Sequence, residues 1–232
     1  NLLPCACAIA VVAASANARA SDVPDGAVAG AVTAIKAGRL VDVAAGRVRN
    51  DQLVLVQDGK ITAVGPAATI PVPPGATLID LSAQTVLPGL IDTHTHITSD
   101  PTTPPYHDYG ISNPRAALMG ARFARETLLS GVTTIRNVGA GGYTDIALRD
   151  AINAGDVIGP RILASGPALG ITGGHCDVTG FAPGVLEQGP KDGVADGPWE
   201  VVEAVRYQIK HGAQVIKTCA TAGVLSLEGP VG

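Results

Sequence analysis

The chain has 232 residues, a net charge of −4 and 46% hydrophobic residues. This length and hydrophobic content are enough for one large or two small globular domains, and nothing in the composition indicates disorder. The acidic balance and the lack of a basic cluster exclude a nucleic-acid partner that is held by phosphate contacts. Aromatic residues make up only 3% of the chain, which argues against an aromatic-rich binding surface.

The first twenty residues differ in composition from the rest of the chain. Residues 2–14 are almost wholly apolar, and small residues in an A-x-A arrangement follow them. This pattern predicts a secretory signal peptide over residues 1–20, cleaved after Ala18 or Ala20, with a clipped start because no initiator Met precedes it. A buried N-terminal helix is the alternative. With a signal peptide, we expect a periplasmic or secreted protein that keeps no membrane anchor after cleavage.

The chain contains four cysteines, of which Cys5 and Cys7 would leave with the signal peptide. Only Cys176 and Cys219 would remain in the mature protein. Two cysteines do not make a disulfide framework, so we predict buried or site-lining thiols. A disulfide between them is the alternative.

Residues 28–85 are typical of β structure. Short runs of apolar and β-branched residues are separated by turn residues, and Asp58-Gly59 is a strong hairpin signal. We predict a small sheet-rich unit with strands at residues 34–42, 52–56, 60–64 and 77–81.

From residue 86 onward, strand-like and helix-like segments alternate. Strands separated by helices of about 10–15 residues are typical of βαβ units, which build a parallel sheet. We therefore predict an α/β fold. After an opening strand near residue 90, it has strands at residues 132–136, 161–165 and 214–218 and helices at residues 113–130, 144–154 and 199–211.

The segment LPGLIDTHTH at residues 87–96 is the most informative in the chain. Alternate side chains of a strand project from the same face, so His94 and His96 lie on one side, about 7 Å apart along the backbone. Two neutral imidazoles on one strand are a natural half-site for a divalent transition metal, which can make water nucleophilic at neutral pH. Two solvent-facing histidines are the alternative. Asp92 shares their parity and has either a structural role or accepts a hydrogen bond from an imidazole N–H.

Two further residues are candidates for the same site. Lys217 lies inside an apolar strand-like run, where a lone ammonium is costly to bury. A buried neutral amine can capture carbon dioxide as a carbamate, although the residues alone favour a lysine that reaches the rim of a barrel. His175 follows the third barrel strand and a glycine-rich turn, so it either orients substrate or is an ordinary loop histidine.

Taken together, these motifs resemble one family. The run from Val86 to His96, the segment GVTTIR at residues 131–136 and the sequence GGH at residues 173–175 resemble the metal-dependent amidohydrolase superfamily. The sequence ADGP at residues 195–198, followed by a helix and GAQVIK at residues 212–217, is similar to its imidazolonepropionase-like branch. That branch contains exported Xaa-Pro and related dipeptidases.

The resemblance implies a (β/α)8 TIM-type barrel with a β-sandwich segment, which would cover residues 28–85, ahead of the barrel at residues 86–232. It implies that His94, His96 and a carboxylated Lys217 bind divalent metals, usually zinc, although manganese, cobalt or iron would also suit these ligands. This implication reverses the interpretation of Lys217 from the residues alone. The metals would activate a water for attack on an amide carbonyl, and His175 would contact substrate.

The sequence also departs from the family pattern. Asn137 stands where relatives often carry aspartate, and Cys176 stands where glycine is common. The chain stops after the fourth barrel strand, whereas the family places two more histidines and a catalytic aspartate on later strands. We therefore expect an N-terminal fragment, inactive and aggregation-prone alone, whose general base lies beyond residue 232.

For the whole protein, the sequence predicts an exported hydrolase of amide bonds that acts on a dipeptide or another small molecule and forms a possible homo-oligomer. Hydrolysis of a cyclic amide is one alternative, and a non-catalytic metal-binding half-barrel is another.

Overall fold

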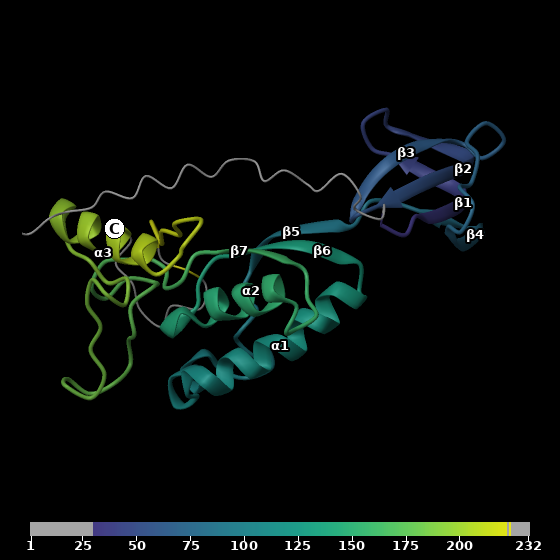
Figure 1. Cartoon of the computed structure of the whole chain (residues 1–232). Helices are drawn as coiled ribbons and strands as arrows, with labels where there is room; N and C mark the ends of the chain where they lie inside the picture. Colours follow the sequence, from purple (N-terminus) through teal and green to yellow (C-terminus); the bar gives the residue numbers. More distant parts are fainter. Residues whose placement is uncertain (1–29, 222, 224–232) are drawn as a thin grey trace, which may run out of the picture. The chain divides into compact units, whose positions relative to one another are not determined.

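A computed structural model describes residues 30–221 and residue 223 of the chain. They divide into two compact units, with the boundary between Leu87 and Pro88 (Figure 1). The predicted signal peptide, with Cys5 and Cys7, lies outside the described residues. Within the described part, none of the helices combines the length and the apolar character that a membrane span requires.

The first unit is a four-stranded sheet. Its strands are β1 (Thr33–Asp42), β2 (Arg47–Gln57), β3 (Lys60–Pro66) and β4 (Thr77–Val86), in the order β3-β2-β1-β4. β2 pairs with β1 and β3 in antiparallel fashion, whereas β4 is parallel to β1.

The turn between β2 and β3 shows why the hairpin signal in the sequence was reliable. Asp58 and Gly59 both have positive φ, at 51° and 71°, as the two central residues of a tight primed turn require. Ala34, Leu53 and Leu55 form the buried core of this unit. A sandwich of two sheets stays a prediction.

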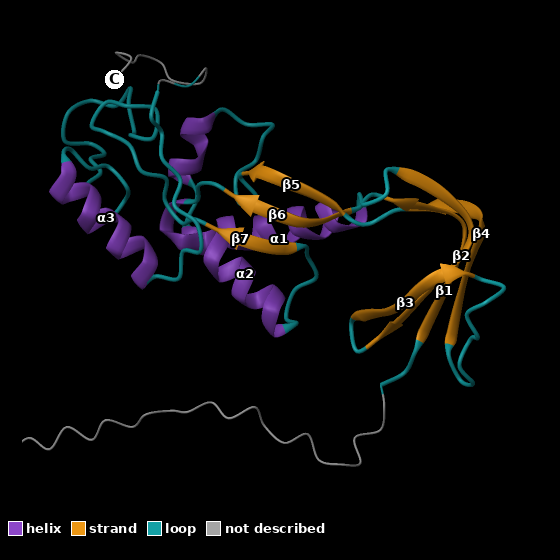
Figure 2. Cartoon of the chain, turned by 90° about the horizontal axis from the view of Figure 1, so that it is seen from above, coloured by secondary structure: helices purple, strands orange, loops and turns teal. Residues whose placement is uncertain are grey.

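The second unit alternates strands and helices, as the sequence predicts. Its strands β5 (Leu90–Thr95), β6 (Val132–Asn137) and β7 (Arg161–Ala164) form a parallel sheet in the order β5-β6-β7 (Figure 2). The α-helices are α1 (Asn113–Leu129), α2 (Thr144–Ala154) and α3 (Pro198–Lys210), and the short helices are η1 (Pro105–Gly110) and η2 (Gly141–Tyr143). This succession confirms the predicted α/β class with a parallel sheet.

One face of the parallel sheet is covered by α1 and α2, as Figures 1 and 2 show. The helices and strands share one core, to which α1 contributes Ala124, β6 contributes Ile135, α2 contributes Ile146 and β7 contributes Ile162. The three strands therefore run in the same direction over a common support, and their carboxyl ends lie along one edge of the sheet.

The prediction of a fourth strand at residues 214–218 is wrong, because no regular strand forms there. The segment does lie parallel to the chain that follows β7: the Leu169 N–H donates to the Lys217 carbonyl at 2.8 Å, and the Cys219 N–H donates to the Leu169 carbonyl at 2.7 Å. However, only an isolated bridge between Leu169 and Thr218 forms. β7 ends at Ala164, and Gly166 with positive φ and Pro167 without an N–H prevent a continuous ladder.

Candidate metal centre

The predicted histidine pair lies at the carboxyl end of β5. His94 belongs to the strand and His96 follows it by one residue. Their ring centroids are 5.6 Å apart and the ring planes are inclined by 58°. Two imidazoles at this separation on one rigid element are close enough to share a metal ion, as the strand parity predicts.

A backbone carbonyl fixes the orientation of the His96 ring. His96 Nδ1 lies 3.1 Å from the Gly139 carbonyl oxygen, just beyond the end of β6. Because a carbonyl only accepts, Nδ1 carries the proton and donates this hydrogen bond, which leaves Nε2 as the ring's lone-pair nitrogen. In most metal sites, a histidine that binds metal through one ring nitrogen donates a hydrogen bond from the other, often to a backbone carbonyl.

A buried polar network supports the same turn. The Asn137 Oδ1 atom accepts a 2.6 Å hydrogen bond from the Ile97 N–H, next to His96, and Asn137 Nδ2 donates to the Gly139 carbonyl at 3.3 Å. Asn137 Nδ2 also donates to Asp145 Oδ2 at 3.1 Å. Asn137 therefore connects the ends of β5 and β6 with the start of α2.

Asp145 completes this network from inside the protein. Its side chain is fully buried and accepts backbone hydrogen bonds from Ser165, Gly166 and Ile146 at 2.8–3.2 Å. Burial raises the pKa of Asp145 despite these hydrogen bonds, which work in the opposite direction. Asp145 and Asn137 were absent from the predicted site, because neither carries a spacing signal.

The other three predicted site residues all influence the pKa of His96. Withdrawal of the His96 ring from water is the largest cause that lowers the pKa of His96, and the hydrogen bond to Gly139 opposes it. The charges of Lys217, His94 and His175 lower the pKa of His96 further. Each of these three groups is therefore close enough to His96 to act on it electrostatically, and a neutral His96 is the form that binds metal.

Lys217 and His175 come from two segments that a disulfide joins. Lys217 is half-buried, and Cys219 two residues later is bonded to Cys176, with the Cα atoms 5.9 Å apart. The expectation of buried or site-lining thiols is wrong, and the alternative of a disulfide is correct, because the pairing of Leu169 with residues 217–219 brings the two cysteines together. Asp92 accepts a hydrogen bond from the His94 backbone N–H, so its observed contact is with the strand itself.

The donor set fits a divalent metal. In the described part of the chain, no three His, Cys, Asp or Glu side chains gather as a ready-made metal site. The candidate centre instead combines two imidazoles with the amine of Lys217, which becomes an oxygen donor when it is carboxylated. Imidazole and carboxylate-type ligands both suit zinc. The roles of His94, His96, Lys217 and His175 as ligands or substrate contact stay predictions.

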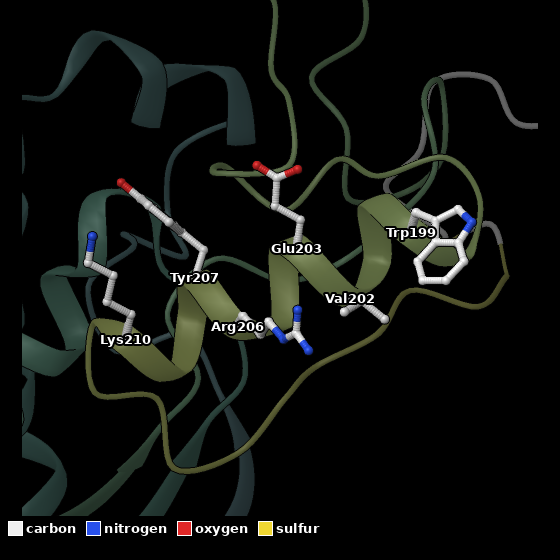
Figure 3. A pocket seen from close by; sticks show the side chains of 6 residues that line it. All are labelled: Trp199, Val202, Glu203, Arg206, Tyr207 and Lys210. Carbon is white, nitrogen blue, oxygen red and sulfur yellow. The ribbon is translucent and has the colours of Figure 1, made fainter.

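A second feature of this unit is a hollow on α3. It is lined by Trp199, Val202, Glu203, Arg206, Tyr207 and Lys210, all from the same helix (Figure 3). The side chains project outward from the helix surface, and none of the predicted site residues lines the hollow. It is separate from the candidate metal centre.

Comparison with known proteins identifies the family of this chain. Residues 85–230 match the amidohydrolase family, and this match contains the histidine pair, His175 and Lys217. The chain belongs to the amidohydrolase family. This match confirms the resemblance to the amidohydrolase superfamily. The parallel sheet β5-β6-β7 is accordingly part of an amidohydrolase barrel.

Individual relatives of this amidohydrolase chain support the assignment. Ochratoxinase from Aspergillus niger is 37% identical over 84% of the chain. The structure of a Xaa-Pro dipeptidase with bound methionine is 37% identical over 84% of the chain, with a TM-score of 0.77. The structure of the A. niger ochratoxinase covers 87% of the chain at 31% identity, with a TM-score of 0.72.

The amidohydrolase chain spans about half the length of these relatives. It covers 43% of the curated ochratoxinase sequence and 48% of the dipeptidase chain. The parallel sheet β5-β6-β7 therefore corresponds to part of the barrel in these relatives.

Proposed function

We propose that the protein to which this chain belongs is a metal-dependent hydrolase of amide C–N bonds. One observation carries the proposal: His94, His175 and Lys217 come from three separate segments, and the charge of each lowers the pKa of His96. The Nδ1 atom of His96 is in turn hydrogen-bonded to the Gly139 carbonyl. A ring oriented in this way presents Nε2 to a ligand, which an unconstrained surface histidine does not do.

The residues would act as follows. His94 and His96 would hold the metal through ring nitrogens, with His96 using Nε2. The Lys217 amine would add to carbon dioxide and release a proton, so that the resulting carbamate oxygens become ligands. When bound, the metal would lower the pKa of a water molecule so that it attacks a carbonyl at neutral pH. His175 would contact the substrate carbonyl or its carboxylate.

For substrate class, we propose a small amide, with a dipeptide as the first choice. The relatives include a Xaa-Pro dipeptidase and an ochratoxinase, and both names point to small molecules rather than to polymers. No feature of the described residues favours nucleic acid, and the net charge of −4 opposes it. Side chains beyond this half of the barrel would set the preference among small amides.

We propose export as well. The apolar start with its A-x-A pattern supports a signal peptide, and the Cys176–Cys219 disulfide supports an oxidising compartment, since such bonds are rare in the reducing cytosol. Mass spectrometry of the protein from its native host would test this: a mature N-terminus near residue 19 or 21 supports export, and an intact leader contradicts it.

The function is tested on the full-length protein. Metal content is measured by mass spectrometry, and hydrolysis is assayed against Xaa-Pro dipeptides, other dipeptides, a cyclic amide and ochratoxin. We expect bound divalent metal and release of an amine from at least one amide. His94→Asn should lose most of the metal and the activity, whereas His107→Asn, on the exposed η1 helix, should lose neither. A metal-free protein without hydrolysis of any compound contradicts the proposal.

A further inference from the structure

We propose that the Cys176–Cys219 disulfide is a positioning element of the active site, which fixes the loop that carries His175 against the segment that carries Lys217. The inference rests on the proposed function for its catalytic consequence, and on the described contacts for the attachment itself. Neither cysteine is proposed to touch substrate or metal.

The first observation is that the His175 loop is attached at both ends to one segment. At its start, Leu169 forms two backbone hydrogen bonds, of 2.8 and 2.7 Å, with Lys217 and Cys219. At its end, Cys176 is joined to Cys219 by the disulfide. Residues 170–175 therefore form a loop that leaves the Lys217 segment and returns to it within a few residues.

The packing of the loop is specific for this closure. A Cβ atom at Gly170 would lie only 3.0 Å from Cys176 Cβ, so the glycine allows the cysteine to approach the base of the loop. The Gly173 N–H donates to Asp177 Oδ2 at 2.7 Å, which closes the turn within the loop. The disulfide is thus the covalent part of a compact turn and does not span two distant surfaces.

The second observation is a contact between His175 and the chain that follows Cys219. A Cβ atom at Gly223 would lie 2.2–2.5 Å from the His175 ring atoms, so the backbone there passes directly against the imidazole. The two segments therefore meet at the disulfide and again at the ring of His175. A covalent bond one residue from His175 and two from Lys217 limits how far either side chain can move relative to the other.

The test uses the full-length protein and three variants: Cys176→Ser, Cys219→Ser and the double variant. Because a disulfide needs both sulfurs, each single variant and the double variant should show the same loss in kcat/KM, about 10–100-fold as for other residues that orient ligands. A rise in KM would show that His175 is displaced from its position for substrate. A fall in kcat with loss of metal would show that Lys217 is displaced. Ala124→Gly, in the buried interior of α1, is the control for reduced stability alone.

Hydrogen–deuterium exchange gives a readout that is independent of activity. In the cysteine variants, exchange should increase together in residues 170–177 and 217–221, and Ala124→Gly should leave both segments protected. Variants that keep kcat/KM within two-fold and show unchanged exchange overturn the proposal. So do single variants with unequal losses that add in the double variant, because the sulfurs would then act separately, and so do two free thiols in the wild-type protein.

Failure of the proposed function looks different. A full-length protein that binds no metal and hydrolyses no amide contradicts the function whatever the cysteines do. In that case the exchange measurement still decides whether the disulfide holds the two segments together.

Discussion

At the scale of single residues, Asn137 connects several backbone segments near the candidate centre. It is fully buried, and its amide contacts Ile97, Gly139 and Asp145. These contacts use the amide's different ends: the oxygen accepts and the nitrogen donates. An aspartate at this position would lose the donor and would face the carboxylate of Asp145.

We therefore predict that Asn137→Asp destabilises the protein by about 1–3 kcal/mol at neutral pH, because two adjacent buried carboxyls cannot both ionise. The pKa of Asp145 is already raised by burial. In the unfolded protein, Asp145 releases its proton near the ordinary pKa of about 3.8, whereas in the folded protein it keeps the proton to higher pH. The free energy of unfolding therefore falls as pH rises above that value. The second carboxyl should steepen that fall in urea unfolding curves measured between pH 4 and 8.

The control for this prediction is the exchanged pair, Asn137→Asp with Asp145→Asn. It restores one carboxyl and one amide in the network and should recover part of the stability, with a shallower pH dependence. Equal stability of Asn137→Asp and wild type at all pH values would contradict the role given to the Asn137–Asp145 contact.

A second prediction at this scale concerns the contact between Gly223 and His175. Gly223→Ala places a methyl group where the His175 ring lies, so the ring must move. We expect KM for the substrate to rise about 10–100-fold, as for other residues that orient a site, while the metal content stays unchanged. Gly189→Ala, where a Cβ meets nothing within 4 Å, is the control for adding a methyl group to a loop glycine away from His175. A KM equal to that of wild type would show that His175 does not contact substrate.

At the scale of elements, the sequence predicted what hydrophobic periodicity and turn residues encode. The helix at residues 144–154 and the hairpin at Asp58-Gly59 match the structure because both have strong local end signals. β4 runs to Val86, five residues beyond its predicted end, because pairing with β1 extends it through the polar residues Ser82–Thr85. Pairing is a tertiary effect that the local pattern does not contain.

The same limit applies to the candidate site. Strand parity and position indicated His94 and His96 as candidates. The group that orients His96 is the backbone carbonyl of Gly139, and every residue has a backbone carbonyl, so the sequence does not show which one takes this role. The disulfide was the less favoured alternative, since its formation depends on how residues 169–176 and 214–219 pair. Only the fold brings these segments together.

The turn after β6 yields a prediction that tests the orientation of His96. Gly139 has φ of 152°, and a Cβ there would lie 3.0 Å from the His96 ring. Gly139→Ala should strain the backbone by about 1–3 kcal/mol. It should also displace the imidazole and lower metal affinity about 10–100-fold, measured by competition with a chelator.

Gly155→Ala is the matched control for that variant. Gly155 also has positive φ, at 84°, but a Cβ there meets nothing within 4 Å. It should reduce the free energy of unfolding to a similar extent and leave metal affinity unchanged. Equal metal affinity in both variants would contradict the role of Gly139 in orienting His96.

At the scale of the whole molecule, the described parallel sheet has an open edge at β5. The chain spans about half the length of its relatives, and in the described residues β5 pairs only with β6. Its other edge presents unpaired backbone groups, and Leu90 and Ile91 on this strand are more than half exposed. An exposed apolar edge strand is a template for pairing with a second chain.

We therefore predict that the 232-residue chain, produced alone, self-associates through the edge of β5. Ile91→Lys should shift its mass, measured by light scattering after gel filtration, towards the monomer, because a lysine on an edge strand opposes pairing. Ile158→Lys is the matched control: Ile158 is similarly exposed, at 63% against 67%, but it lies in the loop before β7. If both lysines reduce association equally, general apolar exposure drives it. If only Ile91→Lys does, the strand edge is responsible.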